Sequence, residues 1–454
     1  MPGHKRKSIA GISPEFASVD FTEVEGTDDL HDPSGIILEA EKYAAEILGA
    51  DETFFLINGS TSGVLAAISG CVKKGGKLLM ARNSHRSALN AVYLRDIVPV
   101  FIFPDHLEEP FIPDALSTAD VEKGLDENPD VEAVFIVSPT YEGRLSDIRS
   151  IAEAVHKRGI PLIVDEAHGA HLSFTKNSSS DAIRSGADVV IQSVHKTLPA
   201  PTQTALLSVK GRIADSAKIR RFLSIYQSSS PSYPLMSMID GCVRYMAENG
   251  DELISKLQTN FEKMLNRLEV CDKLIFSPCI KDLREGRADY GKLLICTGKC
   301  RETGFETARI LREEFGIETE MDSEGYVLAM FTVCDDPEDF HRVTEALIAL
   351  DKRLSPNTDP KDAAGLKRAT DFRPLKKMGF AESCDAPHEE VPLEEAEGRV
   401  CASLIYMYPP GTPLLIPGEE ISGKLIRFLQ ESVENGANIK GITSSGISVV
   451  KKLV

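Results

Sequence analysis

The sequence predicts an α/β protein whose central sheet is mostly parallel and covered by helices on both faces. Short apolar strands alternate with helical patterns through the first half of the chain, which is typical of parallel sheets buried on both faces. Polar residues of chemical interest stand where several of these strands end, and such sheets bind ligands at the carboxyl ends of their strands. The 454 residues suffice for about two to three domains.

The first part of the chain predicts an arm followed by a large domain over 36–233. Residues 1–35 are rich in Gly, Pro and Asp and lack periodicity, so we expect an extended N-terminal arm. Residues 36–48 have the apolar spacing of a helix. Helices are also expected at 64–72 and 148–158, and strands at 53–57, 77–80, 98–103, 133–137, 160–164, 189–191 and 205–209.

The remainder predicts smaller α+β units. A linking helix over 234–268 leads into a small domain that ends near 354, with strands at 292–295 and 327–332 and helices at 305–315 and 337–350. The C-terminal domain over 355–454 begins with a linker or surface helix at 355–376. A strand at 400–407 follows, then an irregular loop at 408–419, which holds four prolines and two glycines, and a helix at 421–434.

Composition limits the classes of function. The net charge of −18 argues against a nucleic-acid partner, which would need a basic face, and it fits a cationic substrate. No apolar stretch follows the basic N-terminus, and none approaches the ~20 residues of a membrane span. Nine cysteines without a CxxC pair or a zinc set predict free thiols in a reducing compartment. We therefore expect a cytoplasmic protein without a membrane partner.

A lysine and an aspartate at neighbouring strand ends point to one cofactor. Lys196 follows the apolar stretch 187–192, where a solvated surface lysine is uncommon, and such a lysine suits a Schiff base with an aldehyde. Asp165 directly follows the strand expected at 160–164. One interpretation of this aspartate is that it only caps the end of the strand. A carboxylate there can hold a pyridine nitrogen protonated, so the pair predicts pyridoxal 5'-phosphate (PLP).

Hydroxyls and glycines at 58–63 predict a phosphate site. This turn leads into a helix, and backbone N–H groups at a helix N-terminus bind phosphate. Ser60, Thr61 and Ser62 are the candidates, with an ordinary helix cap as the alternative. Ser193 and His195, which flank the lysine, are expected to complete the phosphate cup.

Three histidines lie in sequence contexts that point to a function less specifically than those of Lys196 and Asp165. His85 follows the strand at 77–80 and could stack on the cofactor ring, although a lone histidine is more often structural. His168 and His171 have a spacing that suggests a metal, but a third ligand is missing. We therefore place them among cofactor-pocket or packing residues, and we add Ala167 to the pocket.

Taken together, these segments resemble the bacterial ornithine/lysine/arginine decarboxylase family, a fold-type-I PLP-dependent group. The resemblance implies a transferase-like large domain with a mostly parallel sheet, plus smaller α+β C-terminal domains. It also implies a homodimer or larger homo-oligomer with the active site at the interface. The matching segments are PGHKR (2–6), DFTE (20–23), DDLHDPSG (28–35), NGSTSG (58–63), RNSHRS (82–87), SPTYEG (138–143), DEAHGAH (165–171), SVHKTL (193–198) and YPPGTPLLIPGE (408–419).

The resemblance implies roles for single residues. Lys196 is the lysine that binds PLP covalently, Asp165 is the partner of the pyridine nitrogen, and His85 stacks on the ring. Thr140 is expected close to the cofactor. Glu419 is expected to meet the distal cation of the substrate, in its own or the neighbouring subunit, since a carboxylate pairs well with a guanidinium or ammonium. The alternative for Glu419 is an exposed loop glutamate.

The implied activity is PLP-dependent decarboxylation of a basic L-amino acid, with arginine ahead of lysine and ornithine. The products would be CO2 and agmatine, cadaverine or putrescine, and Lys196 or His85 would return a proton to Cα. An aminotransferase or aldolase of the same fold type is the first alternative, and a non-catalytic PLP-binding regulatory subunit is the second. The chain lacks the N-terminal wing of larger members and begins directly at PGHK, so their large ring assembly is not expected.

Overall fold

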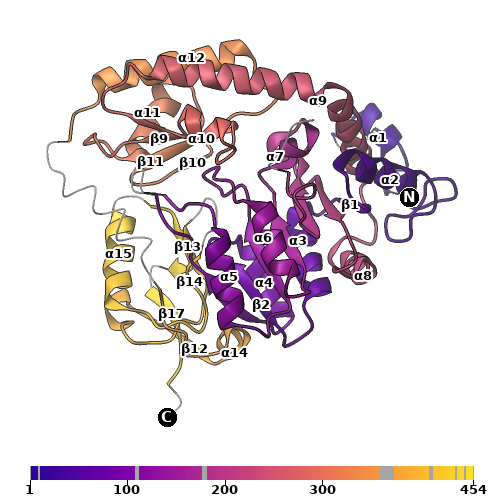
Figure 1. The fold of residues 1–454 in the computed structure, drawn as a ribbon, viewed down its shortest axis with the longest axis horizontal. Coiled ribbons are helices and arrows are strands. Elements are labelled where there is room, and N and C mark those ends of the chain that lie inside the picture. Colours follow the sequence, from indigo (N-terminus) through magenta and orange to yellow (C-terminus); the bar gives the residue numbers. More distant parts are fainter. Residues whose placement is uncertain are drawn as a thin grey trace.

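The structure, a computed structural model, describes residues 2–8, 11–107, 112–175, 181–357, 373–407, 413–434, 437–443 and 446–452. Within these residues the chain forms one seven-stranded sheet and three smaller sheets. Figure 1 shows the large sheet with its helices on the right, two long helices along the top, and the C-terminal part, with helix α15, at the lower left.

The large sheet is mostly parallel, as predicted. Its strand order is β1-β7-β6-β5-β4-β2-β3, and β7 runs antiparallel to both of its neighbours. The remaining pairs, from β6 across to β3, are all parallel. The strands are β1 (Glu52–Leu56), β2 (Lys77–Ala81), β3 (Val98–Ile102), β4 (Ala133–Val137), β5 (Leu162–Asp165), β6 (Val189–Ser193) and β7 (Ala205–Val209).

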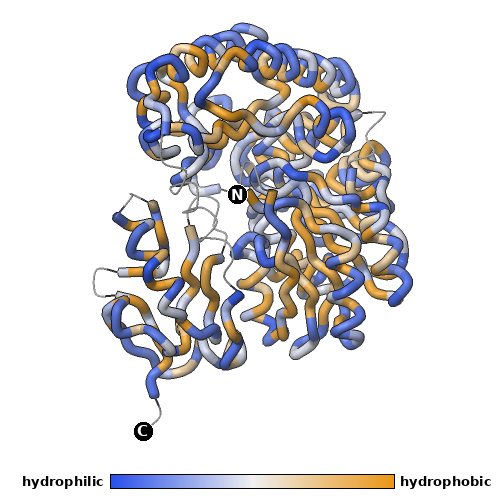
Figure 2. The backbone as a smooth tube through the Cα atoms, turned by 60° about the vertical axis from the view of Figure 1, so that its left-hand side comes forward, coloured by the Kyte–Doolittle hydropathy of each residue, from blue (hydrophilic) through white to orange (hydrophobic). Residues whose placement is uncertain are grey.

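Helices cover both faces of this sheet because alternate strand residues point to opposite sides. Leu78 and Met80 of β2 share a core with α3, α4 and α8, whereas Leu79 shares another with α5 and α6. The apolar segments, orange in Figure 2, are concentrated inside this domain. Its helices are α2 (Ile36–Leu48), α3 (Gly59–Cys71), α4 (Arg86–Leu94), α5 (Thr118–Glu127), α6 (Ile148–His156), η1 (Ala170–Phe174), α7 (Val194–Thr197) and α8 (Ser216–Tyr226).

Two predictions near the N-terminus need correction. The expected extended arm contains a short helix, α1 (Pro14–Val19), which Ser13 caps by accepting the N–H of Phe16. The expected turn at 58–63 is the first turn of α3, which begins at Gly59 rather than at residue 64. The apolar spacing hid this turn, because Ser, Thr and Gly carry no apolar period.

The second sheet is antiparallel and lies beneath two long helices (Figure 1). The long helix expected at 234–268 is present as α9 (Tyr233–Leu268), with Pro234 in its first turn. The strands are β8 (Ile275–Ser277), β9 (Lys292–Cys296), β10 (Met321–Asp322) and β11 (Tyr326–Met330), and the other helices are α10 (Ile280–Arg284), α11 (Gly304–Phe315) and α12 (Pro337–Arg353).

The C-terminal part contains two three-stranded sheets and helix α15. Of the strand expected at 400–407, only residues 405–407 form a strand, β13. Residues 413–415, which belong to the expected irregular loop, form β14, and β14 pairs with β13. Residues 408–412 of that loop and 358–372 of the expected linker lie outside the described residues. The elements are α14 (Phe380–Asp385), β12 (His388–Val391), η2 (Leu393–Glu395), β13 (Ile405–Met407), β14 (Pro413–Leu415), α15 (Gly423–Glu434), β15 (Ile439–Lys440), β16 (Ile442–Thr443) and β17 (Gly446–Val450).

One further observation concerns the chain as a whole. Among the residues that the structure describes, no helix combines the length and the apolar composition that crossing a bilayer requires. The predicted domain boundaries at 35, 233 and 354 stay a prediction.

Candidate active site

The ends of two parallel strands bring Asp165 and Lys196 into one site. Strand β5 ends at Asp165 and pairs with β6, which leads directly into the short helix α7 that carries Lys196. Asp165 is buried, and its Oδ1 accepts the N–H of Ala167 at 3.1 Å. Burial raises the pKa of Asp165, while the positive charge of Lys196 and the Ala167 hydrogen bond oppose this shift.

Lys196 is half-buried, and its amine contacts an imidazole. Its Nζ lies 2.9 Å from Nε2 of His168. Burial lowers the pKa of Lys196 from 10.5, with Asp165 and Glu320 acting in the opposite direction. A lowered pKa increases the uncharged fraction of the amine, and only the uncharged amine can attack a carbonyl carbon.

A second lysine, which the sequence analysis did not single out, reaches the same imidazole. Lys292 opens strand β9 of the second sheet and is fully buried, and its Nζ lies 2.8 Å from Nδ1 of His168. Burial lowers the pKa of Lys292 to about 8. The sequence contained only a weak signal for Lys292, because a lysine at the edge of an apolar strand commonly places its ammonium group in solvent.

Helix α3 and strand β6 meet at the expected phosphate site. A side chain on Gly63 would come within 2.7 Å of Leu56 and 3.0 Å of Ile191, so glycine allows this close approach. Ser62 is buried and donates to the carbonyl of Gly59 at 2.8 Å. Ser60 is half-buried and Thr61 is exposed, both in the first turn of α3.

The hydroxyl of Ser193 lies buried at the end of β6, without a hydrogen-bond partner among the described residues. The hydroxyl of Thr197, one residue after Lys196, is also buried and has no hydrogen-bond partner among the described residues. Buried hydroxyls are normally paired, so these two oxygens indicate a site for a polar ligand. His195 lies between them in sequence, with its Nδ1 2.9 Å from the carbonyl oxygen of Thr204. Burial lowers the pKa of His195.

His85 caps helix α4 while its ring stays accessible to solvent. Its Nδ1 accepts the backbone N–H of Ser87 at 3.2 Å and lies 2.8 Å from the Ser87 hydroxyl. The surrounding protein atoms and the positive charges of Lys196 and Arg86 lower the pKa of His85 to about 4. The ring is therefore uncharged at neutral pH. An uncharged ring is compatible with the expected role of stacking on a cofactor.

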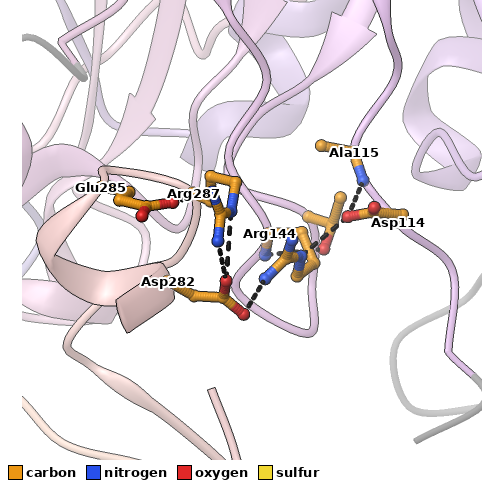
Figure 3. A network of polar contacts seen from close by, with 7 residues as sticks. Asp114, Ala115, Arg144, Asp282, Glu285 and Arg287 are labelled. Atoms are coloured by element: carbon orange, nitrogen blue, oxygen red, sulfur yellow. Dashed lines mark hydrogen bonds and ion pairs between the residues drawn. The ribbon is translucent and has the colours of Figure 1, made fainter. Parts of the chain in front are cut away.

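Thr140 lies in a tight turn that hydrogen bonds and ion pairs connect to the domain of the second sheet. The N–H of Thr140 donates to the carbonyl of Arg144 at 2.8 Å, and its Oγ1 accepts the N–H of Arg144 at 3.1 Å. Figure 3 shows the Arg144 guanidinium between two carboxylates, Asp114 at 2.7 Å and Asp282 at 3.1 Å. This network holds the loop at 138–143 against the domain that supplies Lys292.

Glu419 is buried rather than exposed, and both of its carboxylate oxygens are engaged. Arg82 donates to Oε1 at 2.8 Å and to Oε2 at 2.9 Å, and Oε2 also accepts the N–H of Ile416. Glu419 could receive a substrate cation only by giving up part of this pairing. Its expected substrate role stays a prediction.

The two histidines with metal-like spacing point to different partners. His168 lies between the two lysines, whereas Nε2 of His171 lies 2.9 Å from the buried carboxylate of Asp289. Within the described residues, no group of three or more His, Cys, Asp or Glu side chains is placed to hold a metal ion.

These residues fit PLP. Lys196 provides an amine of lowered pKa, Asp165 a buried carboxylate, and Ser193 and Thr197 buried hydroxyls without a partner among the described residues. A comparison with protein families agrees: residues 12–339 match the Orn/Lys/Arg decarboxylase major domain, and residues 372–445 match its C-terminal domain. The chain belongs to the Orn/Lys/Arg decarboxylase family. Its cofactor is accordingly PLP.

Relatives of this decarboxylase extend over nearly its whole length. An arginine decarboxylase of Bacillus subtilis (strain 168) is 31% identical, with 99% of this chain and 93% of that protein covered. An arginine decarboxylase of Halalkalibacterium halodurans is also 31% identical, with 97% and 91% covered. A constitutive lysine decarboxylase of Escherichia coli is more distant, at 26% identity.

Solved structures support the fold of this decarboxylase. The Francisella novicida lysine decarboxylase matches with a TM-score of 0.85 at 17% identity, covering 99% of this chain and 78% of that one. The Escherichia coli constitutive lysine decarboxylase matches with a TM-score of 0.81 at 21% identity, covering 99% and 79%. The family and its neighbours show a fold-type-I PLP enzyme.

Proposed function

We propose that this chain is a PLP-dependent decarboxylase of basic L-amino acids whose preferred substrate is L-arginine. The observation that carries the proposal is Lys196, whose amine of lowered pKa lies beside a buried carboxylate at the neighbouring strand end. The preference for arginine is supported by the two arginine decarboxylases that are 31% identical over nearly the full chain.

The residues of the site divide the chemistry among them. PLP, when bound, supplies an aldehyde for the amine and a ring that accepts the electron pair left when the carboxylate departs as CO2. Asp165 holds a proton at the ring nitrogen. The hydroxyls of Ser193 and Thr197 and the first N–H groups of α3 bind the phosphate.

The two candidates for returning a proton to Cα differ in their suitability. His85 has a pKa of about 4, so at neutral pH its ring has already lost its acidic proton, and its Nδ1 accepts the N–H of Ser87. Lys196 has a pKa below 10.5 and a neighbouring imidazole, His168, that can resupply a proton. We therefore assign the proton transfer to Nζ of Lys196 and the stacking role to His85.

The assembly and location follow from the same proposal. We propose a homodimer, because fold-type-I enzymes of this kind build their sites between subunits, and a cytoplasmic location. Sedimentation velocity on the purified protein tests the first point: a sedimentation coefficient of a single 49.6 kDa chain would contradict it.

The substrate assignment is tested by a product assay. The purified protein with PLP is given L-arginine, L-lysine and L-ornithine separately, and CO2, agmatine, cadaverine and putrescine are quantified. We expect agmatine to dominate. Cadaverine or putrescine as the main product would overturn the arginine preference, and a keto acid without CO2 would indicate an aminotransferase.

Lys196→Ala is expected to lower kcat by more than about a thousandfold, because the amine that binds PLP is lost. The measurement is CO2 release from the product assay. Lys157→Ala, at the exposed lysine that follows helix α6, is the matched control and should keep its rate. Appreciable decarboxylation by Lys196→Ala would contradict the assignment.

A further inference from the structure

One carboxylate beside the candidate active site has no cation bound to it. Glu320 directly precedes strand β10 of the second sheet and is half-buried, and the hydroxyl of Tyr141 donates to its Oε1 at 2.8 Å. Among the described residues, its Oε2 has no hydrogen-bond partner, and no lysine, arginine or histidine lies within ion-pair distance of it. Folding removes part of the water around this carboxylate, and a cationic ligand would replace it.

A short series of side-chain contacts connects Glu320 to Lys196. Nζ of Lys196 lies 2.9 Å from Nε2 of His168, and the ring of His168 packs edge to face on the ring of Tyr141, with the centroids 4.9 Å apart. The hydroxyl at the far end of Tyr141 then reaches Glu320. Glu320 is therefore two side chains away from the amine of Lys196 and does not touch it.

The electrostatics agree with this placement. Burial lowers the pKa of Lys196, and the two carboxylates that oppose the shift are Asp165 and Glu320. The charge of Glu320 thus acts on the space around the amine, although the two groups form no ion pair. A cation that enters this space is attracted toward Glu320.

This position suits the far end of a basic amino acid. In the proposed function the Cα atom reacts beside Lys196, whereas the guanidinium or ammonium group lies at the other end of the substrate side chain. A carboxylate that contacted Lys196 itself would be too close to the reacting atoms to meet that group. A guanidinium can donate to both oxygens of a carboxylate, and Oε2 of Glu320 is still available.

The other carboxylates near the site are less available. Asp165 is 4% exposed and is expected at the ring nitrogen of PLP, and Glu419 is 5% exposed with both oxygens bound by Arg82. Burial raises the pKa of Glu142, so this carboxyl group loses its proton less readily. Glu320 differs from all three, because it is accessible to a ligand and lacks a cationic partner among the described residues.

We propose that Glu320 binds the side-chain cation of the substrate and so selects basic amino acids. Tyr141 is a positioning residue, because its hydroxyl fixes Oε1 and leaves Oε2 directed at the ligand. Glu320 is thereby the alternative to Glu419, whose carboxylate is already paired. The role of Glu320 rests on the proposed function, in which a basic amino acid reacts beside Lys196.

The test compares two ligands that differ in one charge. Agmatine carries a guanidinium, and N-carbamoylputrescine has the same chain with a neutral urea in its place. Calorimetry on the purified protein with PLP gives the Kd of each ligand, and the ratio of the two Kd values measures the preference for the cation. We expect Glu320→Gln to reduce this preference about thirtyfold, because the charge is lost while the shape is kept.

Steady-state kinetics give a second readout. The KM for L-arginine should rise about thirtyfold in Glu320→Gln, while kcat changes less than about threefold, because the contact is remote from the reacting atoms. Glu318→Gln is the matched control, at an exposed glutamate that pairs with Arg312, and it should change neither readout.

A second variant tests the positioning of the carboxylate. Tyr141→Phe keeps the ring against His168 and removes one hydrogen bond to Glu320, so the preference for agmatine should fall about fivefold. This variant decides the question if Glu320→Gln folds poorly, as judged by its urea unfolding midpoint. An unchanged preference in Tyr141→Phe would then overturn the assignment.

A carboxylate that only balances the charge of nearby lysines would give a different result. Glu320→Gln would then change kcat and its pH profile and leave the ratio of the two Kd values unchanged, which would overturn the assignment. A preference that is lost in Glu419→Gln and kept in Glu320→Gln would overturn it as well, because the cation would then belong to Glu419.

The two ligands also separate this role from the proposed function. If the wild type decarboxylates none of the three basic amino acids and still prefers agmatine through Glu320, the proposed function fails and the cation site stands. If the wild type produces agmatine from arginine and Glu320→Gln keeps the full preference, the cation site fails and the proposed function stands.

Discussion

At the scale of single residues, two buried cations show how the chemistry of the head group determines its role. Lys292 is 0% exposed and contacts an imidazole, whereas Arg82 is 7% exposed and makes two hydrogen bonds to one carboxylate. A buried ammonium can lose its proton, and a guanidinium keeps its proton at any ordinary pH. Lys292 is therefore suited to proton transfer, and Arg82 to a permanent ion pair.

The lowered pKa of Lys292 predicts a specific dependence of stability on pH. Its pKa is about 8 in the folded chain and 10.5 in the unfolded one, so between these values the unfolded state binds more protons. The free energy of unfolding from this group therefore rises as pH increases from 8 to 10.5, by about 3 kcal/mol in all. Below pH 8 the buried charge costs this amount.

The measurement is urea unfolding of the wild type and Lys292→Met at pH 7.5, 9 and 10.5. Other lysines, tyrosines and cysteines titrate in this range, so the difference between the two proteins isolates the contribution of Lys292. We expect Lys292→Met to be the more stable protein at pH 7.5 and to lose that advantage by pH 10.5. A difference that does not change with pH would contradict the lowered pKa.

At the scale of elements, the proposed phosphate site depends on how closely helix α3 approaches strands β1 and β6. Gly63 provides this approach, since its Cα faces Leu56 and Ile191. The start of α3, which carries Ser60 to Ser62, is thereby held against β6, the strand that ends at Ser193. Neither element forms the site alone.

Gly63→Ala should push α3 away from the sheet and weaken PLP binding. Its Cβ would lie 2.7 Å from Cδ1 of Leu56, and overpacking of this kind costs about 1–3 kcal/mol. We expect a lower urea midpoint and a PLP Kd raised about tenfold, measured by titration of cofactor-free protein. Gly241→Ala, in helix α9 with open space around it, is the control: it should leave the Kd unchanged and raise the urea midpoint slightly, because alanine favours a helix over glycine. An unchanged Kd for Gly63→Ala would show that the helix position is unimportant.

At the scale of the whole molecule, one buried ion pair joins the C-terminal part to the large sheet. Arg82 follows β2, and Glu419 precedes α15, far away in the sequence. Burial raises the pKa of Glu419 even though Arg82 opposes the shift, so the desolvation of the carboxylate is substantial. Such a pair determines how the C-terminal part docks on the large sheet, and it contributes less to the free energy of unfolding.

Breaking one side of this pair should therefore cost more than removing both sides. We expect Glu419→Gln to lower the free energy of unfolding by about 3 kcal/mol, because the Arg82 charge is left buried, and Arg82→Met/Glu419→Leu to cost less. Urea unfolding measures both. Arg309→Met, in the exposed pair with Glu313, should cost under about 1 kcal/mol. A Glu419→Gln protein of normal stability whose KM for arginine is raised would instead support the substrate role.

The sequence by itself determined the elements and much of the chemistry. Apolar periodicity located the strands of the large sheet and the long helices, because burial selects side chains locally at the period of each element. The strand-end motifs selected Lys196 and Asp165 as candidates, since parallel strands bring their carboxyl ends to one edge. Strands of the C-terminal part were missed, because most of them lack the uninterrupted apolar runs that mark the strands of the large sheet.

Only the tertiary structure decided which distant side chains meet. Lys292 enters the site from the second sheet, and Glu419 meets Arg82 rather than solvent. Neither contact leaves a local signal, because a partner far along the chain is selected by the packing of whole domains and not by neighbouring residues. The charge states of Lys196 and His168 depend on that same packing, since burial and nearby charges set a pKa only after the chain has folded.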